Sequence, residues 1–311
     1  MKKQEYMRYC LFLLLILPVF IHPQTGRSEE PKSIGVIVSL NIKPYAEAVE
    51  GIQSALHENS LRSTVFFLEN YPEKQRELLK DRILRDHFQS LVAVGPEASR
   101  FIWSEFRDHN IRLLYTMVLH PEQIPEAPKD PCGVSMSIPA DMQLSEIAKI
   151  LPKIRRVGLL FDPQYNHDFF QLASRYENST SLSLLPLEVF SRKEIPQVLE
   201  KNWEKVDCLW MIPDRTIISE SIIAYIIKEA LLRKIPVIGY NRFFWESGAV
   251  MSFIFDYKEL GRQTGNLAAE ILRGKYCPET SPAFQIWLNE GVLRKLGTVY
   301  DDSDKKTVKP R

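Results

Sequence analysis

Cysteine is scarce in this 311-residue chain, and neither sign of charge is in excess. Four cysteines are too few for a disulfide-dense miniprotein, and 40 basic against 39 acidic side chains provide no concentrated positive surface for nucleic acid. With 45% hydrophobic and 25% charged residues, long disorder and collagen-like repeats are excluded. What remains is a globular protein long enough for two domains of about 100–150 residues each.

The sequence motifs of common catalytic sites are also absent. There is no GxSxG, HExxH, GxGxxG or Walker phosphate loop, no CxxC, and no Cys/His spacing of a zinc site. The histidines are scattered, and His120 and His167, on predicted loops, have no evident nucleophile beside them in the sequence. We therefore expect no catalytic residue, no metal and no cofactor. Because catalytic triads are assembled in space, an α/β enzyme stays as the least favoured alternative.

The N-terminus combines basic charge with an apolar run. Three basic residues precede twelve apolar residues at 10–21. Twelve is short of the roughly 20 that a membrane span needs, but it suits the apolar part of a secretory signal. We predict a signal peptide over residues 1–26 and a periplasmic mature protein, with an uncleaved membrane anchor as the alternative.

The mature chain would keep three cysteines, an odd number that leaves at least one free thiol. Cys208 lies in the apolar run 206–212 and is predicted to be a buried core residue. Cys132 and Cys277 are candidates for a disulfide. The sequence does not place them near each other, so their pairing stays open.

Apolar runs of strand length alternate with amphipathic helical stretches, a pattern typical of parallel sheets covered by helices. In the first half the predicted strands are residues 34–39, 63–68, 91–95 and 111–117, and the helices are near 45–58, 73–87 and 97–108. A turn-rich segment with four prolines follows at 121–131. The second half then repeats the alternation, with strands at 157–161, 182–189, 207–212 and 236–239, and helices at 167–176, 193–201 and 219–233. We predict an α/β protein of two doubly wound parallel-sheet lobes joined by a hinge.

Ligands of such sheets meet the loops beyond the carboxyl ends of the strands. Several of these loops open into helices, whose first N–H groups favour a carboxylate or phosphate. Asp214 is a candidate to hold a ligand cation, and Tyr165, Tyr240 and Phe243 are candidate aromatic walls. The structural alternatives are that Asn166 caps a helix, that Asp214 pairs with Arg215 at the surface, and that the aromatic rings belong to the core.

The chain resembles the substrate-binding proteins of ABC transporters, specifically the family with tryptophan/tyrosine-type binding components and a type I periplasmic-binding fold. Three runs carry the resemblance most clearly, namely FDYKELGRQ at 255–263, ILRGK at 271–275 and LRKLG at 293–297. Residues 156–166, 234–239, 247–249 and 268–274 add to it, and the first half fits more weakly through 34–38 and 91–98.

The resemblance implies two lobes that clamp a ligand between them. It assigns residues 33–131 plus 253–274 to lobe 1 and 132–252 plus 275–298 to lobe 2. It also places a helix near 257–273 in lobe 1, where Gly261 would permit close packing. Residues 299–311 are a charged tail that we expect to be disordered.

The resemblance also selects cleft residues by position. Asp256 and Tyr257 are the residues that the family has at these positions. His167, Arg215 and Asn241, however, stand where the family usually has Ser, Asn and Asp. Arg215 would suit an anionic ligand or a salt bridge that closes the cleft, so the family's ligand does not transfer. The predicted ligand-binding residues are Asn41, Gly95, Pro96, Glu97, Thr116, Tyr165, Asn166, His167, Asp214, Arg215, Thr216, Asn241 and Asp256.

The leading functional hypothesis is an exported, monomeric binding protein that captures a small solute, such as an amino acid or related carboxylate, for an ABC permease and ATPase. The alternative is an extracytoplasmic sensor that reports its ligand to a signalling partner. Nucleic acid is not an expected partner, because the chain has a signal-like N-terminus and no recognisable helix-turn-helix.

Overall fold

The computed structural model describes residues 33–277, 280–303 and 307–308, which contain two β-sheets. The strand order is β2-β1-β3-β4-β5 in the first sheet and β12-β11-β10-β9-β8-β6-β7 in the second. The predicted signal peptide, residues 1–26, lies outside the described residues. Within the described part of the chain, no helix is both long enough and apolar enough to cross a membrane.

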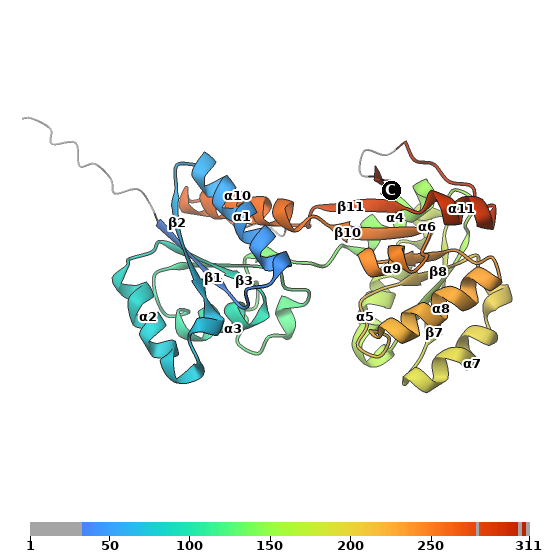
Figure 1. Ribbon diagram of the computed structural model, residues 1–311, viewed down its shortest axis with the longest axis horizontal. Coiled ribbons are helices and arrows are strands. Elements are labelled where there is room, and N and C mark those ends of the chain that lie inside the picture. The colour runs from blue at the N-terminus through green and yellow to red at the C-terminus, as the bar shows by residue number, and fades with distance from the viewer. Residues whose placement is uncertain (1–32, 278–279, 304–306, 309–311) are drawn as a thin grey trace, which may run out of the picture. The chain divides into compact units, whose positions relative to one another are not determined.

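The first sheet is entirely parallel and has helices on both faces. Its strands are β1 (Ser33–Val38), β2 (Arg62–Phe67), β3 (Ser90–Val94), β4 (Arg112–Thr116) and β5 (Gly133–Val134). One face carries α1 (Lys43–Glu58) and α10 (Tyr257–Leu272), and the other carries α2 (Arg76–Arg85) and α3 (Pro96–Glu105) (Figure 1). Because both faces are covered, β1 and β3 are continuous apolar runs rather than alternating ones.

The second sheet is built in the same way, with a separate apolar core on each face. Its strands are β6 (Arg156–Phe161), β7 (Ser183–Glu188), β8 (Cys208–Met211), β9 (Val237–Gly239), β10 (Met251–Phe255), β11 (Phe284–Leu288) and β12 (Thr307–Val308). On one side lie α4 (Ala140–Ile150), α5 (Pro163–Ser174), α6 (Glu177–Thr180) and α11 (Glu290–Leu296). On the other lie α7 (Ile195–Glu200), α8 (Glu220–Leu232) and α9 (Arg242–Glu246).

The predicted α/β fold of two helix-covered sheets is confirmed, with one correction to the second sheet. All of its pairs are parallel except β10 with β11, which run antiparallel with Met251 opposite Leu288. The chain leaves the second sheet along β10, forms α10 on the first sheet and returns along β11, so the two strands run in opposite directions.

The structure differs from the predicted lobe boundaries at three strands. β10 pairs with β9 in the second sheet, although residues 253–255 were predicted for lobe 1. β5 pairs with β4 in the first sheet, although it was predicted for lobe 2. β12 pairs with β11, although it lies in the segment predicted as a disordered tail. Short strands such as these are defined by their partners, which a local pattern does not reveal. Helices α4 and α9 were likewise not predicted.

Close contact between α1 and α10 attaches α10 to the first sheet. A Cβ added at Gly261 would overlap the backbone carbonyl oxygen of Ala48, and one at Gly51 would overlap the carbonyl oxygen of Lys258. The packing role predicted for Gly261 is therefore confirmed, and Gly51 supplies the matching position on α1.

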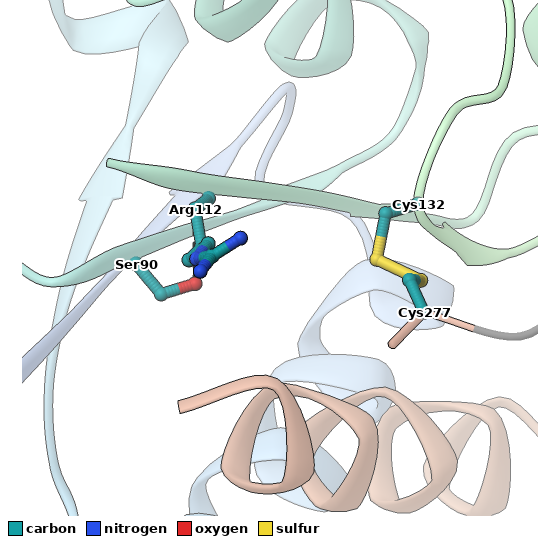
Figure 2. Close-up of a disulfide and its surroundings, with 4 residues drawn as sticks. All are labelled: Ser90, Arg112, Cys132 and Cys277. Atoms are coloured by element: carbon teal, nitrogen blue, oxygen red, sulfur yellow. Dashed lines mark hydrogen bonds between the residues drawn. A yellow bond between two sulfur atoms is a disulfide. The ribbon is translucent and has the colours of Figure 1, made fainter. Parts of the chain in front are cut away.

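A disulfide joins Cys132 to Cys277, which settles the pairing that the sequence left open. Figure 2 shows the bond beside helix α10. Cys132 precedes β5 and Cys277 follows α10, and just beyond the bond Val134 and Thr280 form a parallel bridge. The disulfide therefore joins the segment before β5 of the first sheet to the segment that leads from α10 to β11 of the second sheet. Cys208 is a free buried thiol, as predicted.

Candidate ligand-binding site

The second sheet has a switch point between the neighbouring strands β6 and β8. β6 leads into α5 on one face of the sheet, whereas β8 leads toward α8 on the opposite face. The two loops therefore diverge and leave a crevice at the carboxyl ends of the strands, which is where open α/β sheets bind ligands.

Asp214 organises this crevice through hydrogen bonds within the protein. Its Oδ2 accepts from the Asp162 backbone N–H at 2.8 Å and from Asn166 Nδ2 at 2.7 Å, and its Oδ1 accepts from the Thr216 N–H at 2.8 Å. Asp162 in turn caps α5 and accepts a hydrogen bond from the Thr216 hydroxyl. Asp214 and Asn166 are 3% and 6% exposed, so this network is a buried brace between the two loops.

Arg215 does not pair with Asp214. Its guanidinium carbon lies 5.4 Å from the centre of the Tyr165 ring, and its Nη2 is 3.4 Å from Gln123 Oε1. The side chain is exposed, and no salt bridge to it is found among the described residues. The predicted surface ion pair between Asp214 and Arg215 is therefore wrong, because the Asp214 carboxylate is bound to the neighbouring loop.

The first sheet has its own switch point between β1 and β3, which lead to α1 and α3 on opposite faces. Ser39, after β1, accepts a hydrogen bond from the Ala98 N–H at 2.9 Å through its hydroxyl oxygen. Gly95, the N-cap residue just before α3, has φ +94°, and a Cβ there would approach the Tyr45 ring to 2.8 Å. Only glycine permits both this backbone conformation and this close contact.

The helix N-termini have fewer free backbone N–H groups for a ligand than the sequence suggested. In the first turn of α3, Pro96 has no N–H, while the Ala98 and Ser99 N–H groups are bound to Ser39 and Gly95. In α5, the N–H groups of residues 164–166 all bond back to Asp162. These amides already have partners, so side chains must supply most of the ligand contacts.

Residues from both halves of the chain line a pocket of about 460 Å³, within the usual range for small-molecule sites. Its lining is largely apolar, with polar groups at a few positions. It comprises Tyr45, Pro96, Met117, Val118, Leu119, His120, Gln123, Ile124, Met136, Tyr165, Asn166, Pro213, Asp214, Arg215 and Ile218. A smaller cavity of about 50 Å³ shares five of these residues and adds the rings of Phe169, Tyr240, Phe253 and Phe255.

Five of the predicted ligand-binding residues line the larger pocket, namely Pro96, Tyr165, Asn166, Asp214 and Arg215. The others do not. Gly95, Glu97 and Thr116 lie at the carboxyl edge of the first sheet, and Thr116 is fully buried with no hydrogen-bond partner for its hydroxyl among the described residues. Thr216 braces Asp162, and Asn41 is exposed, with its N–H bound to Glu69. His167 is exposed and contacts Gln171, whereas Asn241 and Asp256 cap α9 and α10.

Several pocket residues were not predicted as ligand contacts. Tyr45, Gln123, Met136 and Phe169 reach the pocket from helices or connecting segments, for which a rule based on strand ends gives no signal. Met117 follows β4 with φ +60°, which is uncommon for a residue with a side chain and marks a locally constrained backbone. His120 lies on a predicted loop, but no partner in the sequence singles it out. Tyr240, in contrast, is one of the predicted aromatic walls, and it lines the smaller cavity.

Two tyrosines near the site stay protonated at neutral pH. Burial, and then the negative charge of Asp214, raises the pKa of Tyr240 to about 12. Burial, and then Glu97, also raises the pKa of Tyr45. Both hydroxyls are therefore neutral groups that can donate as well as accept a hydrogen bond. Within the described residues, no cluster of three or more His, Cys, Asp or Glu side chains is arranged to hold a metal ion.

Comparison with solved structures shows the same fold in proteins of low sequence identity. A ligand-free, open substrate-binding protein with adhesive properties from Clostridium difficile matches with a TM-score of 0.72 and 20% identity, covering 90% of this chain and 100% of that one. An ABC domain in complex with L-Trp from Streptococcus pneumonia matches with a TM-score of 0.55 and 19% identity, covering 88% of this chain and 97% of that one.

Sequence comparison gives the family. A tyrosine-binding protein of Clostridioides difficile (strain R20291) is 21% identical over 286 residues, which is 86% of this chain and 82% of that protein. The family model for ABC transporter substrate binding proteins matches residues 33–307, nearly the whole described chain. Because this model matches most of the chain, the chain belongs to the ABC transporter substrate binding protein family.

Proposed function

We propose that this protein is exported and captures a small solute with a carboxylate and an apolar body, an amino acid or related acid, for an ABC permease and ATPase. The observation that most supports this proposal is the pocket of about 460 Å³, which is lined by residues near the switch points of both sheets. Its volume suits a small molecule, and it needs no covalent chemistry to hold one.

The lining supports the chemical class of the solute. Arg215 supplies a planar cation with donors matched to a carboxylate, and Tyr165 lies beneath it. The rings of Phe169, Phe253 and Phe255 in the adjoining cavity suit an apolar or aromatic side chain. The tyrosine-binding protein and the complex with L-Trp are relatives whose named ligands belong to this class.

Two features support export. The basic N-terminus followed by a short apolar run is typical of a secretory signal. The Cys132–Cys277 disulfide forms and persists in an oxidising compartment such as the periplasm or cell surface. A periplasmic monomer that delivers its solute to membrane-bound transporter subunits fits both features.

Thermal unfolding of the chain from residue 33 onward, with amino acids and their related acids, tests the capture of a solute. A ligand at 100 times its Kd adds about 2.7 kcal/mol of stability, which raises the Tm by roughly 5 °C in a protein of this size. We expect this rise with at least one compound of the panel. A folded protein that none of them stabilises would contradict the proposal.

A matched pair of variants tests whether the ligand binds in this pocket. Tyr165→Ala removes the 42% exposed ring that contacts Arg215 in the pocket, whereas Tyr225→Ala removes a 38% exposed ring on α8, outside the pocket. We expect the first variant alone to reduce the ligand-induced rise in Tm.

A further inference from the structure

We propose that the pocket selects an acid whose α-carbon carries no ammonium group, and that Arg215 is the residue that recognises its carboxylate. This inference rests on the proposed function and narrows its ligand class. The proposed selectivity separates an amino acid from the acid that has the same side chain and carboxylate but lacks the ammonium group. The argument depends on which charges of the pocket are already neutralised within the protein.

The carboxylate that would receive an ammonium group is already occupied. Of the described residues that line the pocket, Asp214 is the one acidic side chain. Three internal donors fill three of its roughly four lone-pair positions, namely the N–H groups of Asp162 and Thr216 and the amide of Asn166. At 3% exposed, it has little surface for a ligand to contact. Asp214 therefore braces the loops rather than presenting a free negative charge.

The remaining acceptors in the pocket are neutral. They are amide and hydroxyl oxygens, for example those of Gln123 and Tyr45, and the His120 ring, within a lining that is mostly apolar. An ammonium ion that enters such a site loses its hydration without gaining a free carboxylate partner, and an unpaired charge is costly to bury. The lining therefore disfavours a ligand ammonium group.

Arg215 has the opposite character. It is exposed, its ring partner Tyr165 is neutral, and its hydrogen-bond partner Gln123 is an uncharged amide. Its positive charge is thus not paired with a carboxylate among the described residues. The aromatic ring and the amide hold a planar guanidinium at the pocket wall, ready for a two-point contact with a carboxylate.

Isothermal titration calorimetry with three matched sets of compounds tests this selectivity. Each set contains an amino acid, the acid without its amino group, and the amine without its carboxylate. The sets are L-tyrosine, 3-(4-hydroxyphenyl)propionate and tyramine; L-tryptophan, indole-3-propionate and tryptamine; and L-leucine, 4-methylpentanoate and isoamylamine. We expect at least one amino-free acid to bind more tightly than its amino acid, and no amine to bind.

Two charge-removing variants test the role of Arg215. Arg215→Gln is expected to weaken the acid by about 10- to 100-fold, the range for loss of charge-assisted hydrogen bonds. Arg175→Gln, which removes an exposed arginine at the end of α5 outside the pocket, should leave affinity unchanged. Because both arginines are exposed, equal Tm values should show that both variants fold.

The outcomes separate this inference from the proposed function. Amino acids that bind as tightly as their amino-free acids, or more tightly, would overturn the inference and leave the proposed function standing. Equal affinities of the two variants for the acid would overturn the role of Arg215. No binding by any acid or amino acid would overturn the proposed function itself, and this inference with it.

Discussion

Asp207 shows how a single residue holds the first strand of the second sheet in place. Its Oδ2 accepts from the backbone N–H groups of Arg155 and Arg156 at 3.0 and 2.8 Å, and its Oδ1 accepts from the Arg156 guanidinium. Burial by itself raises the pKa of this carboxyl, but the side-chain and backbone hydrogen bonds from Arg156 and Arg155 outweigh it. The pKa of Asp207 therefore lies below its ordinary value.

This lowered pKa predicts a pH-dependent contribution to stability. The contribution is fully present above the unfolded pKa of about 3.9 and is lost as the pH falls through the lower, folded pKa. We expect Asp207→Asn to lower the free energy of unfolding by about 1–2 kcal/mol at pH 7, and by less below pH 4. Urea unfolding from pH 7 to pH 3 measures this. The exposed Asp108→Asn should change nothing, and a penalty for Asp207→Asn that stayed constant with pH would contradict the explanation.

At the scale of elements, helix α10 belongs to the first sheet although strands of the second sheet flank it in the sequence. Its attachment depends on helix backbones that approach closely at Gly261 and Gly51. Gly265 continues this contact on α10, facing Ala55 and Ile52 of α1. Small residues at these positions are a packing requirement, separate from ligand binding.

A methyl group at this contact should destabilise the protein. Gly261→Ala places a Cβ against the Ala48 carbonyl oxygen and should cost about 1–3 kcal/mol by overpacking. Gly291→Ala in α11 is the control, because its Cβ would make only an ordinary contact at 3.6 Å. Alanine is the better helix former, so the control should be neutral or slightly stabilising. Chemical denaturation of both variants measures the difference, and equal stabilities would refute the packing explanation.

At the scale of the whole molecule, the Cys132–Cys277 bond closes a long loop of chain. The two cysteines are 145 residues apart, and the loop contains β6–β10 of the second sheet together with helix α10 of the first. The bond therefore restricts the unfolded chain over segments that belong to both sheets in the folded protein.

Loss of this bond should lower the stability of the folded protein. Replacing both cysteines with serine removes the constraint on the unfolded chain and should cost about 2–5 kcal/mol. Thermal unfolding of Cys132→Ser/Cys277→Ser against the oxidised wild-type protein measures the loss. Reduction of the wild-type protein should reproduce the fall in Tm. A wild-type Tm that did not change on reduction would contradict a stabilising disulfide.

The two-sheet fold was predictable because its signals are local. Runs such as 34–38 and 157–161 are apolar throughout, as strands covered on both faces must be, and helical spacing separates them. Cys208 was recognised as core for the same reason. Short elements were missed where the pattern is brief, as at α9, or where only a distant partner defines the strand, as at β5, β10 and β12.

By itself, the sequence determined the alternation of strands and helices and the family, because these depend on neighbouring residues. Only the tertiary structure decided which side chains the loops at the strand ends present to the pocket. Asp214 and Arg215 are adjacent in the chain, yet one is buried by hydrogen bonds to Asp162 and Asn166 and the other is free of ion pairs among the described residues. The tertiary structure also decided that Cys132 and Cys277, which are 145 residues apart, form a disulfide. Which distant residues meet depends on the order of the strands, and that order depends on the packing of the whole chain.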